Sequence, residues 1–106
     1  MKTSQLLMAI LHEHKIEEYE RLHNHIPDEI VKQLLEDGYT NVRIYRKGIT
    51  LIIHMENDEE MRVPNRKPNA AVEDAWHKVT SDCFLQSWEP LSEIFKINDV
   101  ILYPES

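Results

Sequence analysis

The middle of the sequence has the pattern of a β-hairpin, and its place between two helical patterns limits the folds open to the chain. In residues 39–46 polar and apolar side chains alternate, so that Val42 and Ile44 share one face of a predicted strand. Lys47-Gly48 supplies a turn, and residues 49–55 continue as a second apolar stretch. We therefore predict two antiparallel strands at the centre of the fold.

The first third of the sequence predicts one strand followed by a divided helix. Residues 5–11, all apolar after the first, fit a strand buried on both faces. Apolar residues then recur with helical spacing from Lys15 until Pro27, whose ring and missing N–H interrupt a helix. Proline is tolerated at the start of a new turn, so residues 28–36 restart the helix, and Gly38 ends it in a left-handed conformation.

The last third combines a polar connection, a second helical region and a closing strand. Residues 57–69 are polar and contain two prolines, which predicts a loop that is either a lid or an ordering element, or else is disordered. Helical spacing returns over residues 70–85 and resumes over residues 91–95 after a proline. The apolar and β-branched residues 99–103 predict the fourth strand.

The predicted order of strand, helix, two strands, helix and strand is the ferredoxin-like βαββαβ arrangement of the α+β class. A chain of 106 residues with 42% hydrophobic residues can form one such domain, over residues 1–106. Its four-stranded antiparallel sheet carries helices on one face and leaves the other uncovered. If Leu7, Ala9, Leu11 or their partners point to the uncovered face, a second copy of the chain is the simplest cover. We expect a homodimer that forms a dimeric α+β barrel.

Charge and cysteine content exclude several classes of partner. The net charge of -7, with no basic run longer than Arg66-Lys67, argues against a surface that binds nucleic acid. The single cysteine, Cys83, predicts a reduced thiol in the cytoplasm instead of a disulfide framework. The apolar run of residues 6–11 is too short for a signal peptide or a membrane span. We therefore expect a cytoplasmic protein whose partners are neither nucleic acid nor a membrane.

Tyr19 and His23 form the pair of residues most suited to catalysis. On an α-helix, residues four apart share a face with Cβ atoms roughly 5–6 Å apart, so the phenol and the imidazole would project side by side. Histidine has an unperturbed pKa of about 6.5, and a neighbouring hydroxyl can orient the ring or a substrate, so the pair suits proton transfer. The alternative is structural, with Tyr19 at the edge of the core and His23 on the solvated surface of an amphipathic helix.

Several segments resemble the L-rhamnose mutarotase family, and the resemblance covers nearly the whole chain. The segments are Glu17-Glu18-Tyr19-x-Arg21-x-His23-Asn24, Asn41-x-x-Ile44-Tyr45, Asp82-Cys83 with the nearby Trp88, and Ile101-Leu102-Tyr103-Pro104. The resemblance implies a dimer of ferredoxin-like subunits. It also implies a mutarotase that interconverts the anomers of a free deoxy-hexose, a monosaccharide substrate, without a cofactor.

The family pattern also implies roles for individual residues. His23 matches the proton donor, whereas Tyr19, Val42 and the pair Ser87-Trp88 match positions that line the sugar. The chain departs from the pattern where Val42 replaces a common aromatic, where Ser87 replaces one of two tryptophans, and in residues 26–29, which lack the usual tryptophan. Because stacking surfaces select substrates while Tyr19 and His23 are retained, these changes affect the identity of the sugar more than the reaction.

Mutarotation itself needs simple chemistry. The ring oxygen gains a proton while the anomeric hydroxyl loses one, and an acid and a base near neutral pH supply both steps without a metal. Trp88 would offer its ring to the apolar face of the sugar, although a plain core position is an equal alternative. We assign Trp76 to the core, and His54 and His77 to the surfaces of a strand and a helix.

The sequence leaves three alternatives to a mutarotase. A metal site would combine His12, His14 and His25 with His23, but residues two apart on a helix face apart, so we expect no metal. A non-catalytic module that binds a small polyol or metabolite would use the same dimeric sheet; the missing aromatics favour it, whereas the retained His23 favours the enzyme. A cofactor-independent oxygenase of the dimeric α+β barrel type shares the topology, and fold alone cannot separate these functions.

Overall fold

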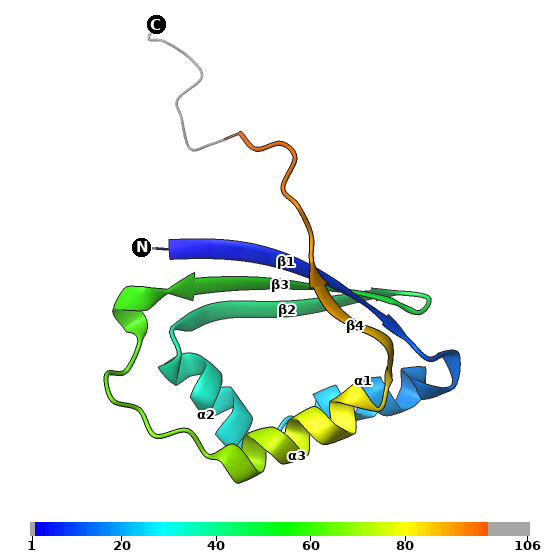
Figure 1. The fold of residues 1–106 in the computed structure, drawn as a ribbon, viewed down its shortest axis with the longest axis horizontal. Coiled ribbons are helices and arrows are strands. Elements are labelled where there is room, and N and C mark those ends of the chain that lie inside the picture. The colour runs from blue at the N-terminus through cyan, green and yellow to red at the C-terminus, as the bar shows by residue number, and fades with distance from the viewer. Residues whose placement is uncertain (1, 98–106) are drawn as a thin grey trace, which may run out of the picture.

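The computed structural model describes residues 2–97 and consists of one antiparallel sheet with helices on one face (Figure 1). In the sheet order β2-β3-β1-β4, the strands are β1 (Lys2–Leu11), β2 (Tyr39–Lys47), β3 (Thr50–Asp58) and β4 (Phe84–Pro90). The helices are α1 (Ile16–Asn24), α2 (Asp28–Glu36) and α3 (Ala70–Ser81), with 3-10 turns η1 (Glu13–Lys15) and η2 (Glu59–Met61). The predicted α+β, ferredoxin-like fold with four antiparallel strands is confirmed.

The central hairpin has the predicted turn. Between β2 and β3 the chain passes through Gly48, whose φ of +60° lies in the left-handed region that favours glycine. Val42 pairs with Met55 and Ile44 pairs with Ile53, so these four side chains share one face of the sheet. That face is the one covered by the helices, and the row of apolar side chains forms its floor.

The predicted division of the first helical region is also present. Pro27 has ψ of 137°, an extended conformation that separates α1 from α2. Beyond α2, Gly38 has φ of +94°, and a Cβ atom there would lie 2.6 Å from the backbone oxygen of Asp58. Only glycine fits this position without strain, because both its backbone angle and its surroundings exclude a side chain.

The helix predicted over residues 70–85 ends at Ser81, and the fourth strand begins at Phe84, so the prediction of helix beyond Ser81 is wrong. The backbone oxygen of Cys83 accepts a hydrogen bond from His12 N–H (2.9 Å), and Phe84 pairs with Leu11, which turns the chain onto β1. β4 pairs with β1 through two register shifts, and such bulges break the alternation by which a strand is recognised in sequence. Residues 91–95 lie in no helix, contrary to the prediction. The strand predicted over residues 99–103 lies outside the described residues.

The core lies on the helix-covered face of the sheet. Its fully buried cluster consists of Ala9, Leu11, Tyr19, Leu51 and Cys83. Ala9 and Leu11 therefore face the helices and do not point to the uncovered face. Because side chains alternate along a strand, the residues of β1 on the open face are Leu6, Met8 and Ile10. Leu6 is 44% exposed, so within a single chain β1 is not buried on both faces.

The connection between β3 and α3 is ordered against α2. The N–H of Val63 donates to the backbone oxygen of Glu36 (2.9 Å), and the Arg66 guanidinium donates to both carboxylate oxygens of Asp37. Asn69 ends the connection as the N-cap of α3, where its Oδ1 accepts from the N–H of Val72 (3.3 Å). The segment is therefore ordered, and its role as a lid stays a prediction.

Candidate active site

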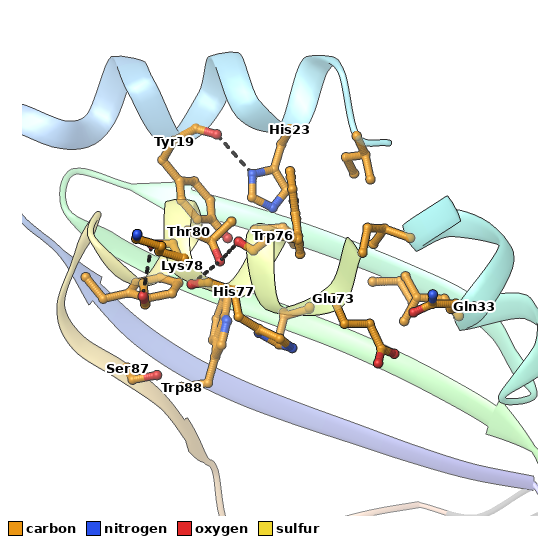
Figure 2. A pocket seen from close by; sticks show the side chains of 18 of the residues that line it. Tyr19, His23, Gln33, Glu73, Trp76, His77, Lys78, Thr80, Ser87 and Trp88 are labelled. Atoms are coloured by element: carbon orange, nitrogen blue, oxygen red, sulfur yellow. Dashed lines mark hydrogen bonds between the residues drawn. The ribbon is translucent and has the colours of Figure 1, made fainter. Parts of the chain in front are cut away.

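A cavity of about 610 Å³ lies between the sheet and the three helices, a volume suited to one small ligand (Figure 2). Its apolar lining includes Ile30, Leu34, Val42, Ile44, Ile53 and Met55. Its polar and aromatic lining includes Tyr19, His23, Gln33, Glu73, Trp76 and Trp88. Apolar walls with a few polar groups that converge on the space are typical of a small-molecule site.

Tyr19 and His23 project from the same face of α1 into this space, as their spacing predicts. Their ring centroids lie 4.1 Å apart, with the ring planes tilted by 32°. Figure 2 shows the imidazole directed from α1 toward Trp76 of α3, and the His23 and Trp76 centroids lie 5.2 Å apart in an edge-on arrangement. Contacts on two sides therefore hold the imidazole plane in position.

The hydrogen bond of His23 determines which ring nitrogen carries the proton. Nδ1 lies 2.9 Å from the backbone oxygen of Tyr19, and because a carbonyl oxygen only accepts, Nδ1 must donate. In the neutral ring, Nε2 is then the unprotonated, proton-accepting nitrogen. Burial lowers the pKa of His23, and the hydrogen bond to Tyr19 opposes this effect only in part. His23 is therefore a neutral imidazole at neutral pH, able to act as a base.

Tyr19 combines two positions that the sequence leaves as alternatives. Its side chain is 3% exposed and belongs to the core cluster, yet it also lines the cavity. Burial raises the pKa of the phenol, and the neighbouring Cys83 raises it further. The hydroxyl is therefore protonated at physiological pH and can donate a hydrogen bond to a ligand.

Val42, Ser87 and Trp88 line the same cavity as Tyr19 and His23, so the structure brings all five predicted site positions together. Trp88 packs edge-on against Phe84, with ring centroids 5.6 Å apart. Ser87 and Trp88 project from β4 and not from a helix, because the chain pairs with β1 at this point. The roles of these residues stay predictions.

The sequence pattern of the L-rhamnose mutarotase family matches residues 5–97. The chain belongs to this family. Family members are isomerases, and the match spans most of β1, the other three strands, the three helices and every residue that lines the cavity. No curated protein matches the sequence.

Solved structures with the same fold include a member of the family. An L-rhamnose mutarotase from Formosa agariphila has a TM-score of 0.70 and 16% identity, over 91% of this chain and 99% of that chain. A putative antibiotic biosynthesis monooxygenase from Nitrosomonas europaea has a TM-score of 0.56 and 14% identity, over 97% and 92%. A conserved protein from Methanosarcina mazei Go1 has a TM-score of 0.52 and 14% identity, over 86% and 89%. At these identities the likeness shows a shared fold and no more.

Several residues of this mutarotase-family cavity are not found by reading the sequence. Trp76 and His77, predicted to be core and surface, both line the cavity, as do Gln33 and Glu73. The sequence does hold one signal: Trp76 and His77 follow Glu73 by three and four residues, so each lies near Glu73 on the same side of α3. That spacing alone does not say whether the face meets solvent, core or ligand.

The described part of the chain has neither the pattern of a metal site nor that of a membrane-spanning helix. Within residues 2–97, no three His, Cys, Asp or Glu side chains are grouped so that they could hold a metal ion. His12 and His14 lie with ring centroids 5.4 Å apart and do not line the cavity. No helix in the same range is long and apolar enough to cross a membrane.

Proposed function

We propose that the protein is a mutarotase that interconverts the α and β anomers of a free deoxy-hexose, with L-rhamnose as the first candidate. The arrangement of His23 carries the proposal, because Nδ1 is held by the Tyr19 backbone oxygen and Nε2 is left to exchange protons at the cavity. Membership of the L-rhamnose mutarotase family supports this choice of reaction and of sugar.

In the proposed mechanism, His23 acts first as a base and then as the acid. Nε2 accepts the proton of the anomeric hydroxyl, and as the carbonyl forms at C1, the bond between C1 and the ring oxygen breaks. The imidazolium then donates a proton to the released ring oxygen, which becomes a hydroxyl, so His23 returns to its starting state. After rotation about the C1–C2 bond, the reverse steps close the other anomer. A single imidazole can serve both oxygens because both are bonded to C1.

Tyr19, Val42, Ser87 and Trp88 are the residues proposed to hold the sugar. The indole of Trp88, supported by Phe84, would stack on the C–H face of the ring, and the Tyr19 hydroxyl would donate to a sugar oxygen. Val42 lies in an apolar wall that suits the methyl group of a deoxy-hexose. Ser87 offers a hydroxyl at the edge of the cavity.

The proposed reaction needs no catalytic group other than these residues. Ring opening and closing transfer protons but no electrons, so we propose that no cofactor takes part. We also propose a cytoplasmic location, since Cys83 is a buried free thiol, as expected in a reducing compartment.

A homodimer through the open face of the sheet completes the proposal. Met8 of β1 and Tyr45 of β2 both pair with Ile52 of β3, which makes a continuous apolar strip across three strands. Tyr45 is 54% exposed and Leu6, on the same face, is 44% exposed. A second copy of the chain would cover this strip, and closed two-fold symmetry is the commonest way for a protein to do so.

Exchange spectroscopy by NMR tests the function. Added protein should speed the exchange of magnetisation between the two anomeric protons of L-rhamnose or of another free sugar in a small panel. If every sugar keeps its exchange rate in buffer, the mutarotase proposal is wrong. Saturation transfer from protein to sugar in that case would identify the non-catalytic binding module instead.

A further inference from the structure

We propose that the end of the cavity formed by Gln33, Asp37 and Glu73 is a subsite for the sugar hydroxyls farthest from the anomeric carbon. In this subsite Glu73 is the specificity-determining hydrogen-bond acceptor. The inference rests on the mutarotase function proposed above and adds the part of the site that selects the sugar. All three residues line the cavity, and none lies in the segments that carry the family resemblance.

Helix α3 runs from this end of the cavity toward His23, the proposed catalytic base. The rings of His23 and Trp76 lie 5.2 Å apart, and Glu73 precedes Trp76 by three residues on α3. Residues with this spacing share a helix face, with Cβ atoms roughly 5–6 Å apart. His23, Trp76 and Glu73 therefore follow one another along the cavity (Figure 2). A single hexose ring beside the Trp76 indole would place C1 at His23 and its opposite edge at Glu73.

The polar groups at this end hold one another in place. Gln33 is 5% exposed and, apart from Thr80, is the only buried polar side chain in residues 2–97. With its amide oriented to satisfy both neighbours, Gln33 Nε2 donates to Glu73 Oε1 (2.5 Å), and Gln33 Oε1 accepts from the N–H of Asn69 (3.2 Å). A buried glutamine bonded in this way fixes the carboxylate of α3 relative to α2.

Arg66 forms an ion pair with the same carboxylate oxygen. Its Nη2 lies 3.6 Å from Glu73 Oε1, and its Nε and Nη2 donate to the Asp37 carboxylate at 2.5 and 2.9 Å. Gln33 and Arg66 thus both contact Oε1, which leaves Glu73 Oε2 without a partner among residues 2–97. An immobilised carboxylate with one free oxygen accepts a hydrogen bond from a hydroxyl with little loss of side-chain freedom.

The carbons across the ring from C1 carry the groups that Glu73 would select. In a 6-deoxy-hexose, C5 carries the methyl group, so the hydroxyls at C3 and C4 are the donors within reach of this end. A site built to bond a substrate hydroxyl discriminates against the analogue that lacks it, because its own polar groups are then left unpaired. The opposing interpretation is that Glu73 only anchors Arg66 and the β3–α3 connection.

Substrate preference separates the two interpretations. The ratio of kcat/KM for L-rhamnose to that for its 3-deoxy or 4-deoxy analogue should be about 10-fold or more in the wild type, as expected for a hydrogen bond to a charged group. Glu73→Gln should bring this ratio close to one. Glu29→Gln removes the same charge from an exposed position of α2 and should keep the wild-type ratio. An unchanged ratio in Glu73→Gln, or an equal loss of activity on all three sugars, overturns the proposal.

A glycoside that cannot open tests the subsite without catalysis. Methyl α-L-rhamnopyranoside should bind the wild type in an NMR titration, and its Kd should rise by about 10-fold or more in Glu73→Gln. Glu73→Asp, which keeps the charge but withdraws the carboxylate, should show the same rise, which covers the case in which Glu73→Gln fails to fold. Binding that depends on Glu73 in a protein inactive on every sugar overturns the mutarotase function alone. Activity with Glu73-independent binding, or no binding by the wild type, overturns the subsite.

Discussion

His23 is joined to Tyr19 in two ways, by a hydrogen bond of 2.9 Å from Nδ1 to the Tyr19 backbone oxygen and by ring contact at a centroid distance of 4.1 Å. The hydrogen bond sets the tautomer, and the ring contact sets the plane of the imidazole. Because the accepting oxygen belongs to the backbone of α1, Nε2 keeps its position as long as the helix is folded. Catalysis should therefore depend on the imidazole of His23 and not on the other histidines of the chain.

Removal of that imidazole should abolish most of the activity. His23→Ala should lower the anomer exchange rate by about 10²-fold or more, the scale expected for one general acid or base. His25, an exposed residue at the end of α1, does not line the cavity, so His25→Ala should have little effect. Exchange NMR on both variants gives the comparison. Small and equal effects would mean that the helix contributes surface instead of chemistry.

The pH dependence should follow the lowered pKa of His23. Since burial lowers this pKa below 6.5, Nε2 stays free to accept a proton at neutral pH, and kcat/KM should fall only on the acid side of 6.5.

The free energy of unfolding should also fall on the acid side, because below pH 6.5 the unfolded chain binds a proton at His23 more readily than the folded chain does. The contribution of neutral His23 to stability is thus complete above pH 6.5 and is lost as the pH falls through the folded-state pKa. Denaturant titrations of wild type and His23→Gln should differ in this window, and parallel pH profiles would contradict the assignment.

Replacement of Trp88 should affect substrate binding more than folding. The ring lies in the cavity lining and is supported from the side by Phe84 at a centroid distance of 5.6 Å. Trp88→Phe keeps an aromatic contact but shortens the surface available to the sugar, so KM should rise while the circular dichroism spectrum is unchanged. Wild-type kinetics in this variant would show that Trp88 is part of the core.

Two glycines with positive φ provide a matched test of packing. A Cβ at Gly38 would lie 2.6 Å from the backbone oxygen of Asp58, whereas a Cβ at Gly48 would have no atom within 4 Å. Gly48→Ala should cost about 1–2 kcal/mol in free energy of unfolding, for the left-handed backbone alone. Gly38→Ala should cost clearly more, because β3 must also shift. Chemical denaturation of both variants measures the difference, and equal costs would mean that the contact at Gly38 is relieved without strain.

The open face of the sheet should control the oligomeric state. Light scattering coupled to gel filtration should give twice the chain mass of 12.6 kDa for the wild type. Ile52→Lys places a charge in the centre of the apolar strip and should yield monomers, whereas Val79→Lys, on an exposed position of α3 outside the strip, should not. A wild-type monomer at micromolar concentration would refute the dimer.

Sequence alone determined the features whose signals are local. Pro27 cannot continue a helix and Gly38 accepts a positive φ, so the bounds of α2 follow from a few neighbouring residues, as does the turn at Gly48. The side-by-side placement of Tyr19 and His23 follows from helical spacing in the same way. Together with the resemblance to the family, these signals led to the fold and to five positions that line the cavity.

Tertiary structure decided the features that depend on distant partners. The helical spacing predicted over residues 70–85 runs into Phe84 and Leu85, yet pairing with β1 makes them the start of a strand, because backbone pairing across the sheet outweighs a local preference. The buried face of β1 likewise depends on which side the helices cover, and a run of apolar residues does not show it. Gln33 and Glu73 meet only because α2 and α3 pack over one sheet. A helical period shows which residues share a face, whereas only the packed fold shows what that face contacts.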